Sequence, residues 1–140
     1  MIRNAFSLVE TPSNDPSVKG IVVPHAGYEY SLGTAAYSYS SLEPNRYKRV
    51  VVMGPSHYFY TNKVGVFDAT SIKTPFGTMP IDPEILEIYK NNKTYFKHID
   101  PQNEEVDHSL EMQFPLINYV FGNTVSVVPL IIGDIEGKLG

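Results

Sequence analysis

The strongest constraint on the fold comes from two short β-branched runs that show no alternation of polar and apolar residues. Residues 20–24 (GIVVP) and 49–53 (RVVVM) have the pattern of strands that are buried on both faces of a sheet. Between them, residues 32–42 carry alanines and an aromatic ring at helical spacing. Strand, helix and strand within about 35 residues predict a right-handed βαβ unit with parallel strands.

The middle of the chain predicts a third strand and a capped helix. Residues 63–67 are the strand candidate, and residues 74–80 have the composition of an irregular segment. Asp82 suits an N-cap and Pro83 suits the first helical turn, so we expect a helix that runs to about Lys90. Its apolar stripe is formed by Ile85, Ile88 and Tyr89.

The last third predicts a second helix and a final strand. The helix covers residues 108–119, with Asp107 as its N-cap and with three side chains facing inward, namely Leu110, Phe114 and Ile117. Residues 126–132 (SVVPLII) form the strand. Because proline cannot donate to a ladder, Pro129 predicts a bulge or an edge position for this strand.

These elements together predict an α/β fold with a mainly parallel central sheet flanked by helices. We expect an irregular lead-in over residues 1–19 and one α/β domain over residues 20–140. The pattern ends just after a completed strand, so we expect the sheet to be incomplete. An incomplete sheet exposes edges or apolar faces, which favours self-association.

Composition narrows the class of protein. The chain has 140 residues, 42% of them hydrophobic and 19% charged, which is typical of one globular domain. A net charge of −4 argues against nucleic acid as a partner. The absence of cysteine excludes disulfides, thiolate zinc sites and a thiol nucleophile. No apolar run approaches the ~20 residues that span a bilayer, and the N-terminus is too polar for a signal peptide, so we expect a cytoplasmic protein with no membrane partner.

Two histidines directly follow the two buried strands. His25 comes after the first predicted strand and His57 after the second. Open α/β sheets bind ligands at the carboxyl ends of their strands, so both imidazoles are expected to face one crevice. Histidine is the commonest metal ligand, and two histidines fixed by strand ends can form half of a metal site. Turn residues satisfied by backbone hydrogen bonds are an equally weighted alternative for this pair.

A third group of polar residues opens the second predicted helix. His108 and Glu111 are three residues apart and share a helix face. Such a pair can act as an acid–base couple, add a ligand or orient one. A solvated helix start is the alternative, which the spacing alone favours. The remaining histidine, His98, has no such context and is predicted to be a surface residue.

Tyrosines gather around both histidine loops. Tyr28 and Tyr58 can line an aromatic pocket or hydrogen-bond a bound anion, or they can fill the rim of the sheet. Ser56 precedes His57 and is a further candidate for ligand binding. Adjacent residues rarely point at one another, so Ser56 and His57 do not indicate a serine hydrolase.

Four segments, in this order and spacing, resemble the Memo family, also called mediator of ErbB2-driven cell motility or AmmeMemoRadiSam system protein B. The resemblance covers residues 20–133, and its segments are IVVPHAGY (21–28), MGPSH (53–57), KTPFG (73–77) and DHSLEMQFP (107–115).

The resemblance implies a fold similar to that of the class III extradiol dioxygenases. It also implies that His25 and His57 bind iron or copper, with zinc as another candidate, and that His108 and Glu111 lie near the crevice as catalytic candidates. The family's third ligand, a cysteine from the C-terminal half in animal members, has no counterpart here.

Two functions follow from this resemblance. The first is a metal-dependent oxidoreductase-like activity on a small molecule. The second is a module that binds phosphotyrosine peptides and acts in cell motility and cytoskeletal signalling, with Tyr28, Ser56 and Tyr58 as contacts.

Overall fold

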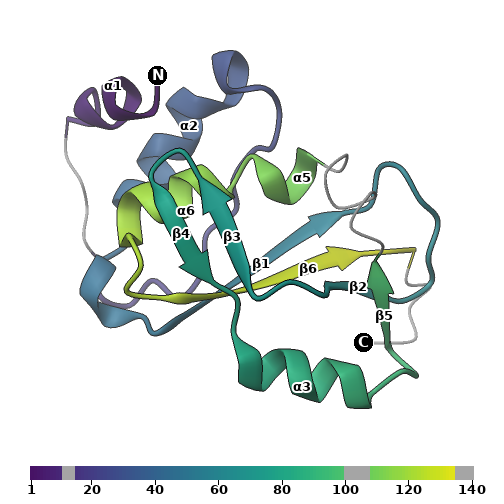
Figure 1. The fold of residues 1–140 in the computed structure, drawn as a ribbon. Helices are drawn as coiled ribbons and strands as arrows, with labels where there is room; N and C mark the ends of the chain where they lie inside the picture. The colour runs from purple at the N-terminus through teal and green to yellow at the C-terminus, as the bar shows by residue number, and fades with distance from the viewer. Residues whose placement is uncertain (11–14, 100–107, 135–140) are drawn as a thin grey trace.

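A four-stranded mixed sheet with helices on both sides forms the centre of the computed structural model, which describes residues 1–10, 15–99 and 108–134. Helices α2, α5 and α6 lie on one side of the sheet and α3 on the other (Figure 1). The strand order is β1-β6-β2-β5, and β3 and β4 form a separate hairpin. The expected α/β fold is therefore confirmed.

The elements have the following bounds. The helices are α1 (Ile2–Ser7), α2 (Tyr28–Ser40), a 3-10 turn (Pro44–Arg46), α3 (Pro83–Asn91), α5 (His108–Glu111) and α6 (Phe114–Phe121). The strands are β1 (Arg49–Pro55), β2 (Val64–Phe67), β3 (Ser71–Thr74), β4 (Gly77–Pro80), β5 (Phe96–Ile99) and β6 (Ser126–Ile132). No helix within these described segments is long and apolar enough to cross a membrane.

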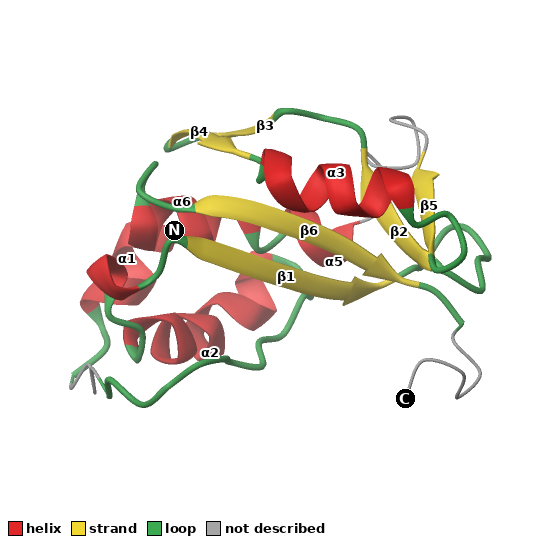
Figure 2. Cartoon of the chain, turned by 90° about the horizontal axis from the view of Figure 1, so that it is seen from below, coloured by secondary structure: helices red, strands yellow, loops and turns green. Residues whose placement is uncertain are grey.

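Strand β6 is the central strand of the core. It pairs in parallel with β1 along its whole length, and Figure 2 shows the two strands side by side. On its other edge β6 pairs antiparallel with β2, which in turn pairs in parallel with β5. Val127 and Ile131 are fully buried. The predicted bounds of this strand, residues 126–132, are confirmed.

The predicted edge or bulge at Pro129 is wrong, because β6 is an inner strand with a continuous register to β1. Asp82 donates its backbone N–H to the Val127 carbonyl. The backbone N–H and C=O groups of odd-numbered β6 residues therefore point towards the β2 edge of the strand. Pairing on that edge consists of an Ile81–Val127 bridge and then the contacts from Leu130 onward. Pro129 lies in the gap between them, where no N–H is needed.

The first predicted strand does not form. Residues 20–24 have no strand pairing, and Val22 is 96% exposed. Side chains hold the two ends of this segment instead: the Tyr47 hydroxyl donates to the Val18 carbonyl, and Gln113 Nε2 donates to the Pro24 carbonyl. The predicted βαβ unit is therefore replaced by an unpaired segment beside β1.

Burial of β1 also differs from the prediction. Val52 is buried against the helices, whereas Val51 and Met53 on the opposite face are 52% and 68% exposed. The run RVVVM thus forms a strand that is buried on one face only, although its sequence lacks polar alternation. Apolar composition alone cannot distinguish these two cases, since exposed apolar side chains are common on protein surfaces.

Helices were predicted more closely than loops. The single helix expected over residues 108–119 is split into α5, which ends at Glu111, and α6, because Pro115 has no N–H to donate to the Glu111 carbonyl four residues earlier. Its inward residues are buried as expected: Leu110, Phe114 and Ile117. The expected N-cap Asp107 lies outside the described residues. Helix α2 spans Tyr28–Ser40 and so begins four residues before the predicted start at 32.

Several short elements were not anticipated. Helix α1 lies within the lead-in, strand β5 carries the exposed His98, and the segment predicted as irregular, 74–80, contributes to the β3–β4 hairpin. Gly77 allows the tight turn of this hairpin, since its φ is +139°. The strand expected at 63–67 is confirmed as β2.

Asp82 links α3 to both long strands. Its carboxylate accepts the backbone N–H of Ile85 at 3.0 Å, which confirms the predicted N-cap. The same carboxylate accepts hydrogen bonds from Arg49 Nε of β1 and Ser126 Oγ of β6, both at 2.6 Å. Asp82 is 5% exposed. These hydrogen bonds, chiefly that from Arg49, lower the pKa of Asp82 to about 2.

We expect Asp82 to make unfolding pH-dependent in acid. Its pKa is lower in the folded chain, so its stabilisation is complete above the unfolded-state value near 4 and is lost as pH falls towards 2. The loss corresponds to about 2 kcal/mol. Asp82→Asn, which can still cap α3, is expected to remove this dependence, as measured by urea unfolding between about pH 5 and about pH 2.5.

Asp68→Asn is the matched control. The exposed carboxylate of Asp68 pairs with Lys90 at 3.0 Å, and its replacement should change the acid dependence less than that of Asp82. Equal acid dependence in wild type and Asp82→Asn would contradict the assignment.

Candidate functional site

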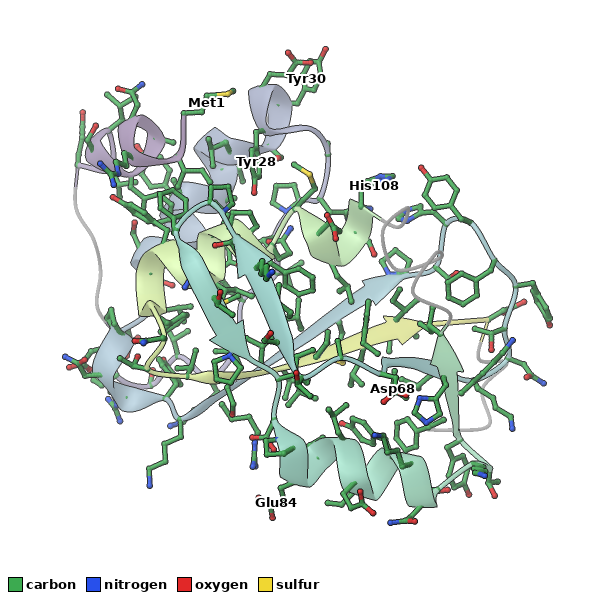
Figure 3. The ribbon with its side chains drawn as sticks, in the orientation of Figure 1. Met1, Tyr28, Tyr30, Asp68, Glu84 and His108 are labelled. Atoms are coloured by element: carbon green, nitrogen blue, oxygen red, sulfur yellow. The ribbon has the colours of Figure 1, made fainter. Side chains whose placement is uncertain are left out.

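Three histidines from three different segments converge at one place. His25 Nε2 lies 3.4 Å from His57 Nε2, and the centres of these rings are 5.2 Å apart. The ring of His108 stacks on that of His57 at 4.9 Å with 17° between the planes, and it lies 6.2 Å from His25. Figure 3 shows His108 at the start of α5, beside the loop after β1. The structure thus brings together the histidines singled out by the sequence, whose role as ligands stays a prediction.

The stacked arrangement gives His108 a different position from the other two. Its ring presents a face to His57, and its Nδ1 lies 3.4 Å from the Tyr58 hydroxyl. Among the described residues, no three or more His, Cys, Asp or Glu side chains form a group that could hold a metal ion. His25 and His57 therefore form a pair, with His108 and Tyr58 beside it.

Tyr28 and Ser56 contact the backbone around this cluster. The Tyr28 hydroxyl donates to the Met112 carbonyl at 2.9 Å and links the start of α2 to the α5–α6 junction. Burial, and next the negative charge of Glu111, raise the pKa of Tyr28 to about 12, so this hydroxyl keeps its proton at neutral pH. Ser56 Oγ donates to the Phe59 carbonyl at 2.6 Å within the loop that carries His57.

Two buried polar residues hold both histidine loops, and sequence reasoning missed them. Ser109 Oγ donates to the Pro55 carbonyl at 2.9 Å, two residues before His57. Gln113 Nε2 donates to the Pro24 carbonyl at 3.1 Å, directly before His25. Ser109 is 2% exposed and Gln113 is 4% exposed.

A signal for this pair was present in the sequence. Ser109 and Gln113 are four residues apart and lie on either side of Glu111 in the segment DHSLEMQ. The functional prediction for this segment considered only His108 and Glu111. The Gln113 side chain is also fixed from its other end, since its Oε1 accepts a hydrogen bond from the Tyr39 hydroxyl at 3.1 Å. A buried amide with both ends bonded has one orientation, which makes it a rigid support.

Gly54 lets α5 approach β1 closely. A Cβ atom at this position would lie 2.8 Å from Ser109 Oγ and 2.9 Å from Leu110 Cδ2. The absence of a side chain therefore allows Ser109 to reach the Pro55 carbonyl.

An apolar cavity adjoins the cluster. It has a volume of about 540 Å³ and lies between the unpaired 19–25 segment and β1. His25, Ser109 and Gln113 contribute polar groups to it, and its apolar lining includes Ile21, Val23, Leu42, Val52, Ile117 and Phe121. Size and lining match those of small-molecule sites, in which a few polar groups orient a ligand within an apolar cavity.

Fold and site together define an α/β protein with a histidine pair beside an apolar cavity, at the carboxyl end of a parallel strand. Residues 1–139 match the family model described as Memo-like protein. The chain belongs to the Memo family.

Named relatives come from archaea, fungi and animals. The chain is 41% identical to a MEMO1 family protein of Thermoplasma volcanium, over 84% of this chain and 43% of that protein. It is 36% identical to a MEMO1 family protein of Saccharomyces cerevisiae, over 86% of this chain and 41% of that protein. It is 33% identical to the memo-1 homolog of Caenorhabditis elegans, over 87% of this chain and 35% of that protein. The chain thus spans less than half the length of each of these relatives.

We expect Gly54→Ala to destabilise the chain by about 1–3 kcal/mol, because the new methyl group overpacks the contact between β1 and α5. Urea unfolding measures this effect. The control is Gly33→Ala in the interior of α2, where a Cβ meets nothing within 4 Å. That substitution should stabilise the helix by up to about 1 kcal/mol. Two variants of equal stability would show that α5 does not pack on β1 as described.

Proposed function

We propose that this chain binds one metal ion through Nε2 of His25 and Nε2 of His57. The supporting observation is the 3.4 Å separation of these nitrogens. Two nitrogens bound at about 2.0–2.1 Å with a tetrahedral angle between them lie about 3.4 Å apart. The same distance is longer than the roughly 2.7–3.2 Å that is usual for hydrogen bonds donated by an N–H group to oxygen. The pair is therefore spaced for an atom between its two nitrogens.

Iron or copper is the proposed metal, and zinc is the other candidate. Imidazole nitrogen is a suitable ligand for all three ions, so the two histidines can bind iron, copper or zinc and do not discriminate among them. When bound, such an ion supplies Lewis-acid or redox chemistry at the coordination positions that the two histidines leave open.

The chain's own residues are assigned three tasks in this proposal. Ser109 and Gln113 position the two ligand loops through the proline carbonyls. The apolar cavity next to His25 excludes water from a bound small molecule. His108, in contact with Tyr58, is placed to hold or transfer a proton at the edge of the site.

Glu111 has an electrostatic role in this scheme. Its charge, after burial, contributes to the raised pKa of Tyr28, whose hydroxyl donates to the Met112 carbonyl.

Anaerobic titration of the metal-free protein with Fe²⁺, Cu⁺ and Zn²⁺ tests the proposal. We expect wild type to bind one equivalent of metal. His25→Ala or His57→Ala should weaken binding more than about 100-fold, since loss of a ligand costs more than loss of a residue that orients one. The matched control is His98→Ala, which removes an exposed histidine on β5 and should leave the affinity unchanged. Equal binding by wild type and the His25/His57 double variant would refute the metal site.

A further inference from the structure

A second pocket lies at the opposite edge of the sheet from the unpaired 19–25 segment. Its volume is about 410 Å³, and it is formed by the loop before β2, the turn after α3 and strand β5. It shares no lining residue with the cavity beside His25. We propose that this pocket binds a small molecule through a phosphate group.

Three lysines from three segments surround the pocket: Lys63, Lys93 and Lys97. Within the described residues, no ion pair joins any of these three lysines to a carboxylate. The chain as a whole carries a net charge of −4. Three ammonium groups around one pocket therefore provide positive charge that attracts anions.

Backbone contacts hold Lys63 and the strand that carries Lys97 in place. Lys63 Nζ donates to the Lys93 carbonyl at 2.6 Å, which ties the loop before β2 to the turn after α3. Lys97 lies on β5, whose pairing with β2 places it opposite Gly65. The Lys63 ammonium group is thus fixed by a contact that exists without a ligand, and the backbone of Lys97 is fixed by the sheet, so binding orders less of the chain.

The floor of the pocket is also rigid. Thr61 is 5% exposed, and its Oγ1 accepts the backbone N–H of Lys63 at 3.2 Å. The Thr61 carbonyl accepts the N–H of Asp134 at 2.7 Å, and the Lys63 carbonyl accepts that of Gly133 at 3.3 Å. A side chain at Gly133 would collide with both carbonyls, so glycine permits this close approach.

The geometry favours phosphate over a carboxylate. Ammonium groups act as point charges that approach from different directions, as a tetrahedral dianion with several acceptor oxygens requires. A planar carboxylate is better matched by the fork of an arginine, and no arginine lines this pocket. Tyr60 and Phe96 add aromatic surface for the rest of the ligand.

Isothermal titration calorimetry of metal-free protein with pyrophosphate tests this proposal. We expect saturable binding that Lys63→Gln and Lys97→Gln each weaken at least about fivefold, because a charged hydrogen-bond donor is lost. Lys73→Gln on β3 is the matched control: it removes the same charge from an exposed lysine outside the pocket and should leave the affinity unchanged. An equal loss in Lys73→Gln, or no saturable binding by wild type, would overturn the proposal.

A second experiment distinguishes a small-molecule ligand from a lipid headgroup. Vesicles of phosphatidylcholine and phosphatidylserine should not sediment the protein, since a pocket of this volume takes a free ligand. Sedimentation with vesicles, together with no pyrophosphate binding, would contradict the inference. The His25/His57 double variant should bind pyrophosphate like wild type, which separates this pocket from the proposed metal site.

Discussion

Two hydrogen bonds from the α5–α6 segment determine where both histidine loops lie. Ser109 holds the Pro55 carbonyl and Gln113 holds the Pro24 carbonyl, and both side chains are almost fully buried. Loss of either donor removes a part-buried hydrogen bond, which costs about 0.5–1.5 kcal/mol. The 3.4 Å spacing of the imidazole nitrogens depends on this support, since His25 follows a segment that no strand pairing holds.

The sheet also positions the loop that carries His57. Strand β6 fixes β1 along seven register pairs, and the Ile132 carbonyl accepts the N–H of Ser56, so the pairing continues into the loop of His57. Asp82 stabilises the opposite end of these strands by joining Arg49 and Ser126 to the start of α3. The histidine pair is therefore set at the end of a rigid two-strand unit, against which α5 packs through Gly54.

Local chemistry made some elements predictable from sequence. The cap at Asp82, the strand over residues 126–132 and the placement of His57 after β1 follow from short-range rules and are present as expected. Residues 20–24 have the same β-branched composition as β1 but form no strand, because strand formation depends on a partner that composition does not reveal. Pro129 fits an inner strand only because of a gap in pairing on one edge, which is a tertiary feature. Ser109 and Gln113 were missed because their function depends on carbonyls that are distant in sequence.

The metal affinity of Ser109→Ala tests most directly whether these hydrogen bonds set the histidine pair. Ser7→Ala is its control, since Ser7 Oγ also donates to a backbone carbonyl, that of Asn4 at 2.8 Å, but lies exposed on α1. We expect Ser109→Ala to bind metal about 10–100-fold more weakly than wild type while remaining folded, as measured by anaerobic titration and circular dichroism. Ser7→Ala should match wild type. Equal affinity in Ser109→Ala and Ser7→Ala would contradict the account.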